Sequence, residues 1–196
     1  MAVQSDGTAW ALYTDGNLYT FDTNTALCQE TSFLAEQTET TLFGMNFVRD
    51  QSSDTERLYI TSDSSNPPFR LATIDVDSLE ISMISSYESI NARAELTSTP
   101  DGRLFGLFEG APFIIAELNR TDGQILSQTS QNLIQYASDS SHFAFAAYSS
   151  NFFLFVGNGS STDIFLYDST RQTTIQQTRI SYGIVGAGFS TCLQHH

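Results

Sequence analysis

The sequence predicts an all-β fold built from four repeats of four strands, and three observations indicate it. Helical periodicity is nearly absent along the 196 residues. Short runs rich in Phe, Tyr, Ile, Val, Thr and Leu are bounded by Asp-Gly, Asn-Gly, Ser-Ser and Pro clusters, which is the pattern of strands and tight turns. Four of these runs end in the same way, with their last residues 53, 44 and 49 positions apart, which indicates an internal repeat.

The repeat is clearest in one strand that runs into an Asp or Asn. This strand is expected at Leu18–Asp22, Leu71–Asp75, Ile115–Asn119 and Ile164–Asp168. A hairpin turn follows each copy. Because an Asp or Asn side chain can accept a hydrogen bond from the backbone two residues on, we expect each turn to be closed by its own first residue.

Three further strands accompany each copy. A second strand is expected ahead of it at Thr8–Tyr13, Arg57–Thr61, Arg103–Phe108 and Phe152–Val156. An inner strand precedes that one at Met1–Ser5, Leu42–Val48, Ala94–Thr99 and Phe143–Tyr148. A more polar outer strand follows at Cys28–Phe33, Glu80–Ser85, Gln124–Gln128 and Thr173–Thr178. Four strands in about 45–50 residues are typical of a β-propeller blade.

The repeats divide the chain into about 1–40, 41–92, 93–137 and 138–182, followed by a closing strand at 183–192. Gly183–Phe189 has the small residues that suit an inner strand near a crowded channel. It either closes a four-bladed ring or begins a fifth blade whose other strands are missing, and a β-sandwich is a further alternative. We favour a small propeller with four blades. Residues 193–196 are interpreted as the remnant of a purification tag, so His142 is the one native histidine.

Charge excludes several classes of partner. Acidic residues outnumber basic residues 22 to 8, the net charge is −14, and the sequence contains no Lys. Nucleic-acid binding requires Lys and Arg to neutralise phosphates, so we expect no nucleic-acid partner.

No apolar run approaches the roughly 18–20 residues of a membrane helix, and we expect no membrane insertion. The first residues also lack the pattern of a signal peptide.

Two stretches carry a resemblance to a known group. Ala94–Gly106, which reads AELTSTPDGRLFG, and Ile184–Cys192, which reads IVGAGFSTC, resemble propeller-type repeat proteins. These are predicted secreted proteins or lipoproteins of myxobacteria and related bacteria, and no activity is assigned to them. The resemblance implies an extracellular, periplasmic or cell-surface location and carries over no functional residue.

Cysteine and metal chemistry give weak signals. Cys28 and Cys192 are 164 residues apart. They either form a disulfide that ties the first unit to the last or remain separate thiols. Acidic loops recur along the chain, but none has the spacing of a calcium-binding loop. We interpret them as turns, and we expect no metal and no cofactor.

The predicted function is that of an exported, non-enzymatic binding or scaffold module. Loops between the second and third strands crowd one face of a propeller, and aromatic rings beside acids and amides can bind a protein or a glycan there. The candidate ligand-binding residues are Tyr13, Asp15, Phe69, Glu109, Phe113 and Asn158.

Two alternatives stay open. Some propellers hydrolyse glycosides with two carboxyl groups, and Glu95, Asp101 and Glu109 are the candidates for such a pair. The other alternative is a structural repeat that assembles into oligomers through open strand edges at the ring seam.

Overall fold

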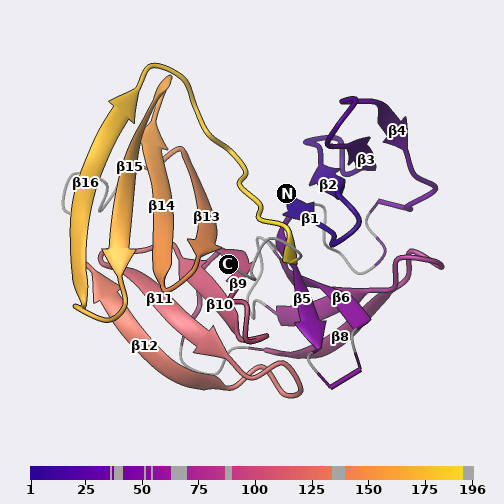
Figure 1. Cartoon of the computed structure of the whole chain (residues 1–196), viewed down its shortest axis with the longest axis horizontal. Coiled ribbons are helices and arrows are strands. Elements are labelled where there is room, and N and C mark those ends of the chain that lie inside the picture. The colour runs from indigo at the N-terminus through magenta and orange to yellow at the C-terminus, as the bar shows by residue number, and fades with distance from the viewer. Residues whose placement is uncertain are drawn as a thin grey trace.

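In the computed structural model the described residues form sixteen strands in four antiparallel sheets of four strands each. The structure describes residues 1–35, 37, 42–50, 52–53, 55–62, 70–86, 90–133 and 140–191, and for Arg70 and Ser86 it describes the backbone alone. Figure 1 shows the sheets arranged around a central axis in sequence order, as the blades of a propeller. The predicted four-bladed β-propeller is confirmed.

Each blade lies within one predicted repeat, and its first strand is the one nearest the axis. Blade 1 contains β1 (Ala2–Val3), β2 (Thr8–Leu12), β3 (Leu18–Asp22) and β4 (Cys28–Glu30). Blade 2 contains β5 (Phe43–Asp50), β6 (Thr55–Ser62), β7 (Arg70–Ile74) and β8 (Ile81–Ser86). Blade 3 contains β9 (Ala94–Ser98), β10 (Leu104–Phe108), β11 (Phe113–Leu118) and β12 (Ile125–Gln131). Blade 4 contains β13 (His142–Tyr148), β14 (Asn151–Asn158), β15 (Ser161–Asp168) and β16 (Thr173–Ile180).

The turn before each outer strand repeats in all four blades. It begins at Asp22, Asp75, Asn119 and Asp168, whose Oδ1 atoms accept a hydrogen bond from the N–H group two residues on at 2.8 to 3.0 Å. The fifth residue of each turn has a positive φ, and these residues are Ala26, Leu79, Gly123 and Gln172. The predicted closure of each turn by its own first residue is confirmed.

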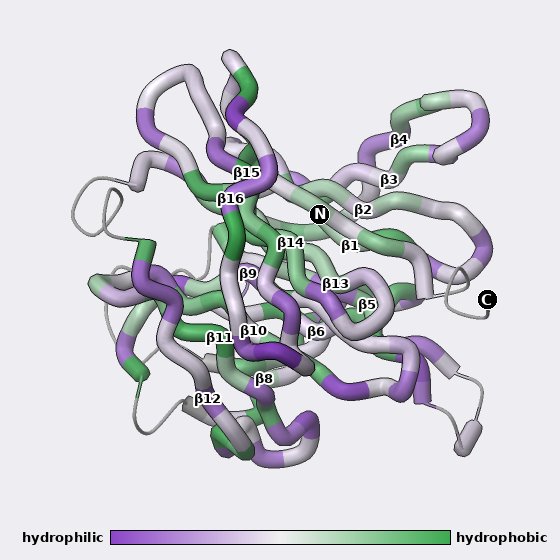
Figure 2. The backbone as a smooth tube through the Cα atoms, turned by 60° about the vertical axis from the view of Figure 1, so that its left-hand side comes forward, coloured by the Kyte–Doolittle hydropathy of each residue, from purple (hydrophilic) through white to green (hydrophobic). Residues whose placement is uncertain are grey.

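Apolar packing between neighbouring blades forms the core in three clusters. One lies between blades 1 and 2 around Trp10 and Phe47, a second between blades 2 and 3 around Tyr59 and Phe108, and a third between blades 3 and 4 around Phe152. Figure 2 shows hydrophobic segments along inner and middle strands and hydrophilic segments at many of the turns. The outer strands β4 and β16 are mostly exposed, which accounts for their polar composition.

Inner strands approach one another closely at the axis. A Cβ atom placed on Gly44 of β5 would lie 2.9 Å from the Cα atom of Glu95 on β9 and would also meet the carbonyl oxygen of Ala94. Both of these neighbours belong to the backbone, so they have little freedom to move aside. The absence of a side chain at Gly44 therefore sets the spacing of blades 2 and 3.

The fourth junction of the ring is built differently. None of the three core clusters joins blade 4 to blade 1 among the described residues. The segment after β16 crosses this junction instead (Figure 1). Ser190 forms a parallel bridge with Val3, and Thr191 Oγ1 donates to a carboxylate oxygen of Glu56 in blade 2. Residues 183–189 form no strand of their own, which differs from the inner strand predicted there.

Two other expectations have a clear outcome near the outer strand of blade 1. The strand predicted at Cys28–Phe33 ends at Glu30, because Phe33 turns into the core between blades 1 and 2. Cys28 is an exposed, free cysteine on the outer edge of this blade, whereas Ser190 bridges the inner edge. Cys192 lies outside the described residues.

The repeated turns predict how stability depends on pH. Backbone N–H groups, above all that of the residue three positions on, hold the pKa values of Asp22, Asp75 and Asp168 below their ordinary value. Since the folded-state pKa is the lower one, the turns contribute stability above the ordinary aspartate range. That contribution is lost as the pH falls through the folded-state pKa.

Blade 3 uses Asn119 in this turn, so Asp75→Asn keeps an acceptor and removes the titration. Between neutral pH and about pH 3 we expect urea unfolding to show a smaller loss of stability for Asp75→Asn than for the original chain. Asp75→Ala, which lacks the acceptor, is expected to be less stable than both at neutral pH. Equal acid sensitivity of the original chain and Asp75→Asn would contradict this account.

The axial packing predicts that Gly44→Ala destabilises the protein. Overpacking against backbone costs typically about 1–3 kcal/mol, and we expect a loss of this size in the free energy of unfolding measured with urea. Gly183→Ala is the matched control, because a Cβ there meets its nearest neighbour, an atom of His142, at an ordinary 3.4 Å. Similar stabilities of the two variants would show that the axis tolerates the added methyl group.

Candidate functional site

One face of the ring gathers the loops between second and third strands together with the beginnings of the inner strands. In each antiparallel blade the inner strand begins at the end where the second strand stops. The loops after the second strands and the beginnings of the inner strands therefore lie on the same face. The described loops on this face are residues 13–17, 109–112 and 159–160. We call it the mouth face, because a hollow at the beginnings of the inner strands opens there.

The mouth face carries a hollow of about 320 Å³, called here the mouth hollow. All four blades contribute residues to it. Val185 also contributes, and it belongs to the segment after β16, called here the closing segment. The lining residues of the hollow are Met1, Leu12, Thr14, Leu42, Phe43, Gly44, Arg93, Ala94, Glu95, Ser141, His142, Phe143 and Val185. The lining is therefore mixed, with apolar side chains beside a small group of charged and polar ones.

An ion pair between two residues of blade 3 lies at the edge of this hollow, and Ser140, just before β13 of blade 4, donates a hydrogen bond to it. Arg93 Nε and Nη2 donate to Glu109 Oε2 at 2.9 and 2.6 Å, and Ser140 Oγ donates to Glu109 Oε1 at 2.5 Å. The Arg93 guanidinium also lies 5.7 Å from the ring centroid of Phe143. Both carboxylate oxygens of Glu109 are thus engaged within the protein.

His142 lies in a hydrogen-bond network that fixes its tautomer. Thr162 Oγ1 donates to the carbonyl oxygen of Tyr182 at 2.9 Å, so it accepts from His142 Nε2, 3.0 Å away. On the other side of the ring, Ser141 Oγ lies 3.0 Å from Nδ1 and accepts from the N–H of Gly159. This network holds the inner strand, the loop at 159–160 and the chain after β16 together, which gives His142 a positioning role.

The candidate residues predicted from the sequence have different positions. Glu109 lies at the mouth hollow, and Tyr13 lies between two residues that line it. The side chain of Tyr13 is 48% exposed and contacts the ring of Tyr19 at a centroid distance of 4.8 Å. Asp15 and Asn158 are exposed on the same face.

The other two candidates do not contribute to this surface. Phe113 is 1% exposed and packs edge to face against Phe143 in the core between blades 3 and 4. It begins strand β11 rather than belonging to the loop before it, so its expected ligand contact is corrected to a core contact. Phe69 lies outside the described residues.

The three candidate carboxylates are not all together. Asp101 and Glu109 lie beyond opposite ends of β10, whose five residues span about 17 Å, so these two cannot form a catalytic pair. Glu95 and Glu109 are nearer, since Glu95 pairs with Leu107 two positions before Glu109. Sequence reasoning missed Arg93 as the partner of Glu109. The available signal in the sequence was the position of Arg93 just before the inner strand β9. This position is opposite Glu109, which directly follows the second strand β10.

The described residues contain neither a metal-binding cluster nor a candidate membrane helix. No group of three or more His, Cys, Asp or Glu side chains in these ranges is placed to hold a metal ion. No helix among them is long and apolar enough to cross a membrane.

Comparison with known proteins gives a fold without a family. No family model and no curated protein matches the chain. Among solved structures, an engineered GH43 glycoside hydrolase with endo-xylanase and exo-arabinofuranosidase activity matches with a TM-score of 0.60 and 9% identity over 89% of this chain. A chain of a nidogen–laminin complex matches with a TM-score of 0.59 and 12% identity over 91% of this chain. The Dos1 propeller matches with a TM-score of 0.51 and 16% identity over 93%.

The chain spans 40%, 64% and 47% of the length of these three structures. At such low identity the likeness shows the propeller fold alone. These neighbours include a hydrolase as well as proteins whose descriptions name no enzymatic activity, so the fold does not decide between catalysis and binding. What the comparisons and the structure together establish is a β-propeller of four blades.

Proposed function

We propose that this protein is a non-enzymatic binding module that recognises a protein partner through its mouth face. The observation that carries the proposal is the exposed apolar rim of the mouth hollow. Val185 and Leu42 line the hollow and are 76% and 37% exposed. Tyr13 lies in the sequence between the lining residues Leu12 and Thr14 and is 48% exposed. Exposed apolar side chains gathered around a hollow are typical of protein interaction sites.

The net charge of the chain indicates which class of protein partner to expect. The chain has a net charge of −14, and its field favours the approach of a basic surface. At the rim Arg93 is already paired with Glu109, whereas Asp15 is exposed and bonds to its own turn through Asn17. We therefore propose a basic partner that inserts an apolar side chain into the mouth hollow. An extracellular or cell-surface location belongs to the same proposal and is supported by the resemblance noted above.

Hydrolysis is the competing function, and one observation favours it. Glu95 lines the mouth hollow on the same blade as Glu109, and a solved structure with the same fold is a glycoside hydrolase. A glycosidase requires one carboxyl group in an apolar setting to act as the acid. Glu109 instead has a guanidinium group at 2.6 Å and a hydroxyl donor on its other oxygen. This arrangement supports binding over catalysis.

The binding proposal is tested with a displayed library of random peptides selected on the whole protein. We expect enriched peptides to combine Lys or Arg with a large apolar residue. Affinity measured by calorimetry is expected to fall about tenfold in Val185→Ser, because burying a Val side chain contributes about 1.5 kcal/mol or more. Leu126→Ser is the control, since Leu126 is 58% exposed on the outer strand β12. Enrichment of acidic peptides, no enrichment at all, or equal loss in both variants would refute the proposal.

The hydrolase alternative is tested separately with arabinoxylan, which the neighbouring hydrolase suggests as substrate. We expect no release of reducing sugar. Release that disappears in Glu95→Gln, with thermal stability retained, would replace the binding proposal with a catalytic one.

A further inference from the structure

A second hollow lies at the other end of the ring, between blades 3 and 4. Its volume is about 570 Å³, which exceeds that of the mouth hollow, and we call it the blade groove. Its walls include the turn before β10, with Asp101, and the turns before β14 and β16, with Ser149 and Gln172. These turns connect strands at the end opposite the mouth face, so the two hollows are separated by the length of a blade.

The composition of the blade groove is that of a site for a polar, uncharged ligand. Its floor is aromatic, with Phe105 and Phe152 packed edge to face at a centroid distance of 4.9 Å. Hydroxyl and amide side chains from β12 and the turns form the walls. A hydroxyl group both donates and accepts hydrogen bonds, which matches the hydroxyl groups of a sugar. An apolar floor with a few oriented polar groups is the usual design of a small-ligand site.

Tyr167 supplies an independent observation that points to a ligand. Its side chain lines the groove, and the residue is only 5% exposed. A buried tyrosine hydroxyl normally has a hydrogen-bond partner. The Tyr167 hydroxyl bonds to no residue in the part of the chain that the structure describes. Among the described residues, the fully enclosed side-chain atoms without a hydrogen-bond partner are Trp10 Nε1, Thr61 Oγ1 and Gln131 Nε2. The Tyr167 oxygen is not one of these enclosed atoms. It is therefore open to the groove.

Arg103 supplies a second donor while adding no net charge. Its Nε and Nη2 atoms donate to the two carboxylate oxygens of Glu117 at 2.8 and 2.6 Å, and its guanidinium lies 4.9 Å from the ring centroid of Phe105. The hydrogen bonds from Arg103 lower the pKa of Glu117, so the pair stays ionised and its charges cancel. The side chain of Arg103 is 48% exposed, and Nη1 makes no hydrogen bond within the described residues.

The remaining charge in the groove decides the class of ligand. With Arg103 and Glu117 paired, Asp101 leaves one negative charge there, on a molecule whose net charge is −14. An anionic ligand is disfavoured by this field. No group of three acidic or histidine ligands stands ready for a metal cation among the described residues. A neutral ligand rich in hydroxyl groups fits these conditions.

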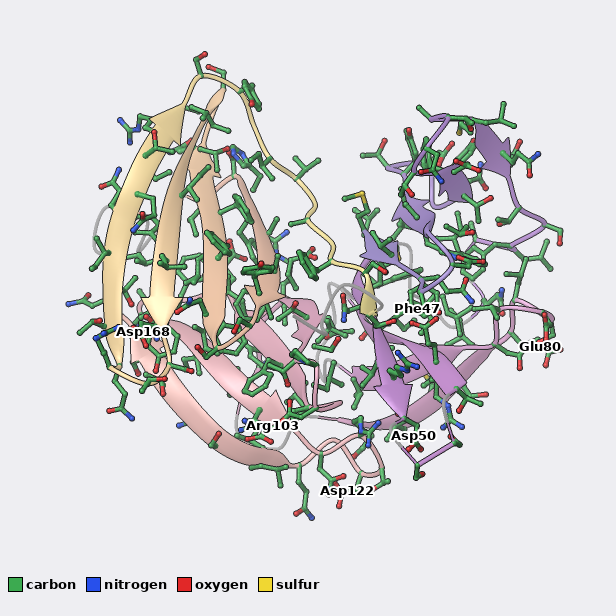
Figure 3. The ribbon with its side chains drawn as sticks, viewed as in Figure 1. Phe47, Asp50, Glu80, Arg103, Asp122 and Asp168 are labelled. Carbon is green, nitrogen blue, oxygen red and sulfur yellow. The ribbon has the colours of Figure 1, made fainter. Side chains whose placement is uncertain are left out.

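Figure 3 labels one residue near the groove on each of the two blades. Arg103 belongs to blade 3, and Asp168 marks the end of β15 in blade 4, directly after Tyr167 in the sequence. We propose that the blade groove binds an uncharged saccharide, with the Tyr167 hydroxyl and Arg103 Nη1 hydrogen-bonding to its hydroxyl groups. This site is separate from the mouth face, and its ligand is separate from the protein partner proposed there.

The test is calorimetric titration of the whole protein with neutral oligosaccharides of xylose, arabinose, glucose and galactose, and with anionic oligogalacturonate. We expect binding of at least one neutral oligosaccharide and none of oligogalacturonate. Tyr167→Phe removes a hydroxyl that has no partner among the residues that the structure describes. We therefore expect unchanged thermal stability and a fivefold to tenfold weaker affinity, about the loss of one hydrogen bond. Tyr13→Phe on the mouth face is the matched control and is expected to bind as the original chain does.

Several outcomes would overturn the blade groove as a saccharide site. These are the failure of every neutral oligosaccharide to bind, preference for oligogalacturonate, and equal affinity of Tyr167→Phe and the original chain. The two proposals are tested independently. Val185→Ser is expected to retain saccharide binding, and Tyr167→Phe is expected to retain peptide binding.

Discussion

Apolar packing between consecutive blades is the interaction on which the rest of this structure depends. A single four-stranded sheet with apolar side chains on both faces cannot bury them alone, and three blade-to-blade clusters provide that burial. Strands β5 and β10 are buried on both faces for this reason. The packing fixes how blades stand relative to one another. It therefore fixes where strand ends and turns from different blades meet, and both hollows lie at such meetings.

Much of this architecture could be predicted from the sequence because it is local and repeated. Asp22, Asp75, Asn119 and Asp168 each close a turn through atoms within three residues, and such interactions leave a periodic mark on the sequence. The strands before and after them could then be placed by counting. The end of the first outer strand could not, because Phe33 leaves the expected strand to fill a core contributed by blade 2.

The candidate site was less predictable, because it depends on contacts between blades. The sequence placed Glu109 in a loop on the mouth face, but the Ser140 hydroxyl that holds it comes from a segment 31 residues away. Phe113 has the composition of a loop aromatic and is fully enclosed, because β11 begins at that residue. The closing segment shows the same limit. Its contacts with Val3 and Glu56 join the last described residues to blades 1 and 2, and no local pattern in the sequence indicates them.

Ion pairs between arginines and carboxylates connect the charge of the chain with its two hollows. Within the described residues, Arg93, Arg103, Arg171 and Arg179 form ion pairs with carboxylates of the same or a neighbouring strand or turn, at 2.6 to 2.7 Å. One of these pairs, Arg93 with Glu109, lies at the mouth hollow, and another, Arg103 with Glu117, lies in the blade groove. Each pair removes a negative charge from a hollow on a strongly acidic molecule while leaving a planar group beside an aromatic ring. The negative charge of the surrounding surface repels an anion but not a neutral or apolar ligand group. In both proposals made above, an arginine of such a pair lies at the surface to which the ligand would bind.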